Sequence, residues 1–198
     1  MQILALLQSF VFLVSSSLFA PVLAALAALA VWTVVRLGEF FSLWLERRKL
    51  ARPPMDLVQR LAAGEDGLPV SRAVRSFRRR LLEIGAQDEV AVVNLVRTTE
   101  RQFWRSLDPL KMAIRVGPGL GLIGTLIPMG AGLASLGQGD LSQLAGDLVV
   151  AFTTTVVGMA VGMAAYCMFT VQRRWIEEDV QHIELISEIE AQRQGGRA

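Results

Sequence analysis

The pattern of hydrophobic and polar positions divides the chain into three long uncharged blocks and the charged segments between them. Two blocks, Val116 to Gly139 and Leu148 to Val171, are each 24 residues long and lack Asp, Glu, Lys, Arg and His. About 20 apolar residues suffice for a helix to cross a hydrocarbon core of about 30 Å. The eight-residue polar connection from Asp140 to Asp147 is too short to return across a membrane. These two blocks therefore predict a transmembrane hairpin of antiparallel helices.

The first block lies near the N-terminus, where residues 1–35 carry no ionisable side chain. Its apolar core from Phe10 to Val35 is long enough to span a membrane once. A signal peptide is the competing interpretation. It is disfavoured because a charged n-region is missing and the apolar run is too long. We therefore expect a multi-pass membrane protein with three spans.

The positions of the charges predict how these spans are oriented. Sixteen of the 20 basic residues lie between Arg36 and Arg115, and the other four lie at or after Arg173. Short loops rich in Lys and Arg face the cytoplasm. The distribution therefore places the N-terminus and the hairpin connection outside, and the middle segment and the C-terminal tail in the cytoplasm.

The charged segments carry helical patterns of their own. Ser71 is a good N-cap for a helix over 72–84 that Gly85 closes, and a short helix is expected over 56–63. Asp88 is a cap for a longer helix that runs with little interruption over 89–115 into the second span. In the tail an apolar stripe at helical spacing is opposed by acidic residues; the stripe comprises Ile176, Val180, Ile183, Ile186 and Ile189.

These patterns predict an all-α membrane protein with three transmembrane helices, long cytoplasmic helical extensions, the N-terminus out and the C-terminus in. The expected order is a first transmembrane helix, a cytoplasmic helical segment, a second transmembrane helix, a short external loop, a third transmembrane helix and a cytoplasmic helical tail. The corresponding ranges are 1–37, 38–115, 116–139, 140–147, 148–172 and 173–198.

The sequence contains few residues in patterns typical of catalytic or metal-binding sites. Gly119, Gly121 and Gly124 spell G-x-G-x-x-G, but they lie within an apolar run and lack the strand that a dinucleotide site requires. His182 is the single histidine and Cys167 the single cysteine. We therefore expect no catalytic residue, no metal and no cofactor.

A basic cluster lies between Arg72 and Arg80. A solvated face next to the membrane explains it best, and binding of lipid headgroups is the alternative. Interleaved aromatic residues are too few for single-stranded nucleic acid, so no nucleic-acid partner is expected.

Small and hydroxylated residues mark the second and third spans. Small side chains let helix backbones approach closely, and those predicted to pack the two helices are Gly117, Gly121, Gly124, Ala151, Gly158, Gly162 and Ala165. Thr153, Thr154 and Thr155 follow one another, and Thr125 lies in the second span. The alternative is that each hydroxyl donates a hydrogen bond to a carbonyl of its own helix. Three successive threonines cannot share one face, so at least one is expected to face a wet or polar partner surface.

The second span opens with Gly117-Pro118-Gly119-Leu120-Gly121-Leu122-Ile123-Gly124-Thr125 and the third contains Thr155-Val156-Val157-Gly158. Both segments resemble the signatures of the MotA/TolQ/ExbB proton-channel family. The order of spans, the outward N-terminus, the large cytoplasmic loop and the helical tail are also similar to TolQ and ExbB. The resemblance covers nearly the whole chain.

The resemblance implies a homopentameric ring around two copies of a single-span MotB/TolR/ExbD-like partner, in a bacterial or archaeal cytoplasmic membrane. Ion flow, with the proton favoured, would be coupled to movement of one component against the other. It also implies that the partner supplies an aspartate and that hydroxyls of this chain line the route. The ion-pathway candidates are Thr125, Thr154 and Thr155.

One departure from the family pattern keeps an alternative open. ExbB-like relatives carry a glutamate about one turn before the third-span threonine, whereas this chain has Leu148, Val149, Val150 and Ala151 there. Asp147, expected at the outer mouth, is the nearest acid. Either the partner supplies the only intramembrane carboxylate, or the chain is a non-conducting oligomeric scaffold that anchors a partner protein.

Overall fold

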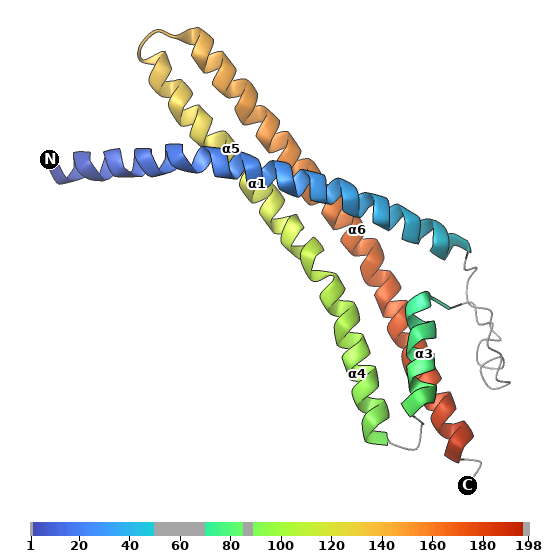
Figure 1. Ribbon diagram of the computed structural model, residues 1–198. Coiled ribbons are helices and arrows are strands. Elements are labelled where there is room, and N and C mark those ends of the chain that lie inside the picture. The colour runs from blue at the N-terminus through green and yellow to red at the C-terminus, as the bar shows by residue number, and fades with distance from the viewer. Residues whose placement is uncertain (1, 50–69, 85–88, 196–198) are drawn as a thin grey trace. The chain divides into compact units, whose positions relative to one another are not determined.

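The computed structural model describes residues 2–49, 70–84 and 89–195. Its helices are α1 (Gln2–Lys49), α3 (Arg72–Ile84), α4 (Glu89–Ser106), α5 (Asp108–Leu136) and α6 (Leu141–Gly195), as Figure 1 shows. No strand occurs within these three ranges. The expected helix over 56–63 and the capping roles of Gly85 and Asp88 lie outside the described residues.

Three stretches of helix in the described residues are long and apolar enough to cross a membrane. They are Ser17–Arg48 in α1, Val90–Leu136 across α4 and α5, and Leu141–Gln192 in α6. The prediction of an all-α protein with three candidate spans is therefore confirmed. At 55 residues α6 is about 80 Å long, well over the thickness of a hydrocarbon core.

The chain divides into two compact units, which we describe separately. The hairpin unit comprises residues 1–38 and 109–168, and so contains most of α1, all but the first residue of α5, and the first half of α6. The tail unit comprises residues 39–108 and 169–198, with the end of α1, α3, α4 and the second half of α6.

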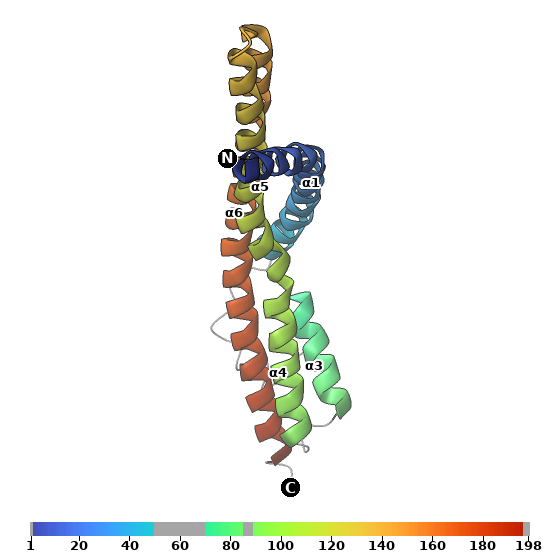
Figure 2. The ribbon, with the colours of Figure 1, turned by 90° about the vertical axis from the view of Figure 1, so that its left-hand side faces the viewer.

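In the hairpin unit α5 and α6 lie side by side as antiparallel helices (Figures 1 and 2). Gly139 makes the turn between them possible because its φ of +83° lies in the left-handed region. Asp140 then caps α6, since its Oδ1 accepts a hydrogen bond from the backbone N–H of Gln143 at 3.0 Å. The connection is therefore shorter than the predicted loop over 140–147, because residues 141–147 already form the first two turns of α6.

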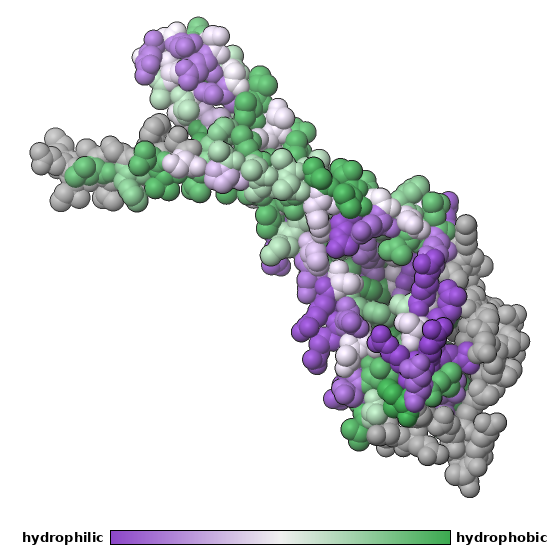
Figure 3. All heavy atoms as spheres, viewed as in Figure 1, coloured by the Kyte–Doolittle hydropathy of each residue, from purple (hydrophilic) through white to green (hydrophobic). Residues whose placement is uncertain are grey.

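Figure 3 shows how hydrophobic side chains are distributed over these elements. They cover most of the α5/α6 hairpin below its tip, whereas hydrophilic residues gather at the tip and over the tail unit. Large exposed apolar side chains on the hairpin include Leu126, Leu133, Phe152, Val156 and Met163. Such a surface suits lipid or a neighbouring membrane helix better than water.

In the tail unit the second half of α6 packs with α3 and α4 around one hydrophobic core. The core consists of Val70, Val74, Phe77, Leu81, Val92, Ile183, Ile186 and Ile189. The expected helix over 72–84 is present with the predicted cap: the backbone N–H of Val74 donates to Ser71 Oγ at 3.2 Å. The tail stripe is buried as predicted, except that Val180 is only half-buried.

The helix expected to run with little interruption over 89–115 is broken only at Leu107. α4 ends at Ser106, Leu107 forms a turn, and α5 begins at Asp108. Pro109 explains the break, because proline lacks the N–H that a continuous helix needs and restricts the residue before it. The interruption is a single residue long, and Leu107 itself is fully buried.

Candidate ion-pathway site in the helical hairpin

The small residues predicted to pack the hairpin bring the backbones of α5 and α6 into contact. A Cβ placed on Gly158 would lie 2.6 Å from the carbonyl oxygen of Gly117 and 2.8 Å from the Cα of Gly121. A Cβ on Gly162 would lie 2.7 Å from a ring carbon of Pro118. No side chain fits at these points without a shift of backbone or of a rigid ring.

Two alanines extend this seam along α6. Ala151 and Ala165 are almost completely buried, and they lie seven residues on either side of Gly158, on the same helix face. Gly124 faces α6 two turns nearer the tip than Gly117. The structure therefore brings the five glycines marked by the sequence together across the two helices, and it buries the two alanines on the same face of α6 as Gly158.

Thr154 lies within the same seam. Its side chain is buried, and a Cβ placed on Gly124 would lie 2.9 Å from both its Cβ and its Oγ1. Its hydroxyl donates to the carbonyl of Ala151 at 2.8 Å. Thr154 thus lies between the two helices and donates its hydroxyl proton to its own helix. Its oxygen lone pairs are still able to accept a hydrogen bond or coordinate a cation.

The other threonines lie at the edge of this contact. Thr125, next to Gly124, is half-buried and donates to the carbonyl of Leu122 at 2.7 Å. Thr153 is exposed and donates to the carbonyl of Val149 at 2.8 Å. Thr155 is half-buried at the same level of the hairpin. Each hydroxyl oxygen that back-bonds in this way still accepts hydrogen bonds or coordinates a cation.

Asp147 points into the hairpin from the second turn of α6. Its residue number places it four before Ala151 and seven before Thr154, so all three share one helix face. A Cβ on Gly132 of α5 would lie 3.6 Å from Asp147 Oδ2. That oxygen is buried and has no hydrogen-bond partner among the described residues. A carboxylate so placed retains its capacity to accept a proton or bind a cation.

A second polar group lies on α5 near this carboxylate. Ser135 is buried, and its hydroxyl donates to the carbonyl of Gly132 at 2.8 Å. Because Gly132 has no side chain, it leaves room for Asp147, and its carbonyl accepts the hydrogen bond from Ser135. Polar side chains thus occur along the α5/α6 contact from the region of the tip down to Thr154.

The tail unit contains a cluster of interactions that sequence patterns did not predict. Arg47 of α1 forms an ion pair with Asp179 of α6, and its guanidinium lies 5.1 Å from the centre of the Trp175 ring. Trp175 stacks on Phe40, with ring centres 5.5 Å apart and an interplanar angle of 17°. Asp179 is buried, although it is one of the acidic residues of the tail that were expected to oppose the apolar stripe.

Another buried ion pair connects α3 to α6. Arg78 Nε lies 3.6 Å from Glu190 Oε1, and both side chains are almost fully buried. The long-range nature of both pairs explains why spacing along the chain gave no sign of them. No group of three or more His, Cys, Asp or Glu side chains suited to a metal occurs in the described ranges.

Comparison with known proteins adds an independent line of evidence. Residues 73–185, more than half of the chain, match the MotA/TolQ/ExbB proton channel family. A biopolymer transport protein ExbB homolog from Methanothermobacter thermautotrophicus is 30% identical over 127 residues. These residues are 61% of this chain and 44% of the relative, so the chain spans less than half of the relative's length. No solved structure matches the chain significantly.

Proposed function

This chain belongs to the MotA/TolQ/ExbB proton channel family, and we propose that it is the ring-forming subunit of an ion-driven motor. In this proposal five copies surround two copies of a single-span MotB/TolR/ExbD-like partner. Ion flow along the interface between ring and partner moves one component against the other. The reaction is transport with mechanical work and needs no covalent chemistry by this chain.

One observation carries the proposal: polar side chains lie along the α5/α6 contact although the two spans are otherwise uncharged. The hydroxyls of Thr125 and Thr154 supply oxygen atoms at one level of the hairpin, and the carboxylate of Asp147 supplies them about two turns nearer the tip. Polar groups inside a membrane are costly and commonly mark ion or proton routes. Their presence at a tight interface favours a transport role over a merely adhesive one.

The proposed orientation follows from the charges. The N-terminus and the hairpin tip face outward, and the tail unit lies in the cytoplasm with nearly all the basic residues. Asp147 is then near the outer end of the route and the threonines lie deeper. An ion arriving from outside meets the carboxylate first and the hydroxyls afterwards.

The partner supplies the second half of the mechanism. A single-span partner with an intramembrane aspartate places a group that alternates between neutral and charged forms beside the ring. Hydroxyl oxygens of this chain solvate either form without adding a fixed charge. We assign this role to Thr125 and Thr155 at the edge of the hairpin contact, and to Thr154 inside it.

The alternative is a non-conducting scaffold that anchors a partner in the membrane. One observation favours it: the hydroxyls of Thr125, Thr153 and Thr154 are all engaged with carbonyls of their own helices. A scaffold needs the glycine seam but neither the threonine oxygens nor Asp147. Substitutions that keep the seam and remove these oxygens therefore separate the two functions.

The stoichiometry is tested by native mass spectrometry of the detergent-extracted protein, expressed alone and together with the product of the adjacent reading frame. The proposal predicts a pentamer of the 21.7 kDa chain that takes up two copies of the partner. A monomer, a dimer or an even-numbered ring that takes up no such partner would contradict the motor assignment.

A further inference from the structure

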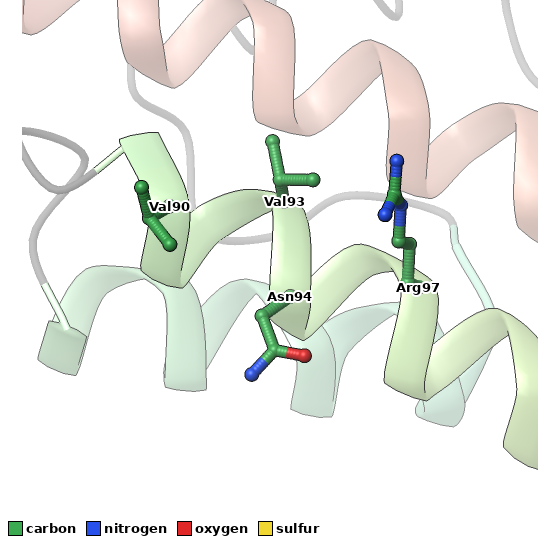
Figure 4. A pocket seen from close by; sticks show the side chains of 4 residues that line it. All are labelled: Val90, Val93, Asn94 and Arg97. Atoms are coloured by element: carbon green, nitrogen blue, oxygen red, sulfur yellow. The ribbon is translucent and has the colours of Figure 1, made fainter.

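The outward face of α4 combines apolar and basic side chains around a hollow. Val90, Val93, Asn94 and Arg97 line a hollow of about 410 Å³, and Figure 4 shows them along a single helix. Their spacing of three, one and three residues places them on one face. Val90 is 80% exposed and Val93 is 43% exposed. Two valines left in water beside an arginine indicate a surface that another element covers.

The basic part of this face continues toward the end of α4. Arg101 follows Arg97 by four residues, and both side chains are exposed. Neither forms an ion pair with another residue in the described part of the chain. The face of α4 formed by Val90, Val93, Asn94, Arg97 and Arg101 is called the basic face below.

The second half of α6 carries a face of opposite charge. Glu177, Gln181, Glu184 and Glu188 follow one another at intervals of four, three and four residues, and all four are exposed. They point away from Ile183 and Ile186, which are buried in the core of the tail unit. Glu177 is held by Arg173 at 2.9 Å on the same helix. These four residues are called the acidic face below.

The two faces match in height along the tail unit. α4 and the second half of α6 run antiparallel (Figures 1 and 2), and Val92 shares a core with Ile186. Moving to higher residue numbers along α4 therefore corresponds to moving to lower residue numbers along α6. Three isoleucines of α6 share this core with Val92, namely Ile183, Ile186 and Ile189. Taking the middle one, Ile186, as level with Val92 puts Arg97 level with Gln181 and Arg101 level with Glu177. At the other end, Val90 lies level with Glu188.

The two faces cannot meet within one chain, because both point away from the core that α4 and α6 share. Between copies related by rotation about an axis along these helices, however, heights are preserved. α4 of one copy then lies antiparallel to α6 of the next at the same level. In such an arrangement Arg97 would lie within one helical turn of Glu184 on the neighbour, and Arg101 would lie opposite its Glu177.

We propose that the acidic face of α6 from a second copy of this chain docks on the basic face of α4. The contact is heterologous, with two different surfaces of one chain, and such contacts close into rings. The inference rests on the proposed ring and names the surfaces that build it outside the membrane. Charged pairs of this kind fix the register and the choice of partner more than the overall affinity.

Charge reversal tests the contact. The double variants R97E/R101E and E177R/E184R each place like charges at the interface, and we expect each to reduce the pentamer fraction at least tenfold in native mass spectra. The fourfold variant that combines them restores opposite charges and should restore the pentamer. R79E/R80E is the matched control, because it makes the same charge change on exposed positions of α3.

Disulfide trapping provides the second measurement. In a C167S background, R97C with Q181C should yield cross-linked dimers and higher species on oxidation, whereas R79C with Q181C should not. The inference would be overturned if the wild-type chain forms a ring and the R97E/R101E variant forms it equally well, or if R97C with Q181C gives no cross-link. Either result would leave the proposed function standing. Loss of the bound partner from an intact ring would overturn it too, because the basic face would then hold the partner. A wild-type chain that forms no ring would contradict the proposed function itself.

Discussion

Gly158 of α6 faces Gly117 of α5 so closely that a Cβ on Gly158 would lie 2.6 Å from the Gly117 carbonyl oxygen. The obstacle is backbone, which cannot rotate away as a flexible side chain can. In a membrane the hydrophobic effect does not drive helices together, so close packing of this kind has to supply the association energy. The glycines therefore position the threonines and Asp147, which lie along the same contact.

Gly158→Ala should weaken the hairpin. The added methyl group collides with the Gly117 carbonyl, and overpacking of this kind costs about 1–3 kcal/mol. Gly130→Ala is the matched control, because nothing lies within 4 Å of its Cβ position. Thermal unfolding in detergent should show a lower midpoint for G158A and an unchanged or slightly higher one for G130A. Equal midpoints for the two variants would contradict the packing described above.

Asp147→Asn should reduce ion transport by the complex with its partner while leaving assembly intact. Asparagine keeps the shape of the side chain but neither takes up a proton nor carries charge at neutral pH, and removal of such a group costs at least about tenfold in proton-transfer rate. Asp140→Asn is the control, because Asp140 is exposed and asparagine caps a helix equally well. Equal transport by both variants would remove Asp147 from the proposed route.

Asp179→Asn should destabilise the tail unit by about 1–3 kcal/mol, because it removes the charge that pairs with the partly buried guanidinium of Arg47. The cost stays below that of a fully buried pair, since the Arg47 side chain is 24% exposed. Glu178→Gln breaks an exposed pair with Arg174 and should cost less than about 0.5 kcal/mol. Thermal unfolding of the two variants measures the difference, and a smaller effect for D179N than for E178Q would contradict it.

Much of the fold follows from local sequence signals. Ser71 fixed the start of α3 because its hydroxyl caps the helix, and the uncharged runs identified the spans through their length. Little interruption was expected between residues 89 and 115, and the break beside Pro109 is indeed one residue long. The connection at the tip was overestimated because polarity was taken as a sign of loop, whereas Asp140 caps a helix that includes the polar residues after it.

The candidate site was only partly predictable. Helical spacing identified the glycine seam, since period and residue size are both visible in the sequence. The direction of Asp147 depends on the rotation of α6 against α5, which the seam sets and which spacing alone does not reveal. Arg47 and Asp179 are 132 residues apart, and nothing in their local sequence marks them as partners. The position of Asp179, an acidic residue among the apolar positions of the tail helix, is the signal that could have indicated a buried basic partner.

The most direct test of the account is ion flux through the complex of this chain with its single-span partner, reconstituted in liposomes under an applied membrane potential. A dye inside the liposomes reports protons, and a matched sodium dye reports sodium. The account predicts flux by the wild-type complex and a loss of at least about tenfold in T125V and T155V, with the assembled mass unchanged. No flux by the wild-type complex, or undiminished flux in both variants, would contradict an ion-driven motor with a threonine-lined route and favour the scaffold.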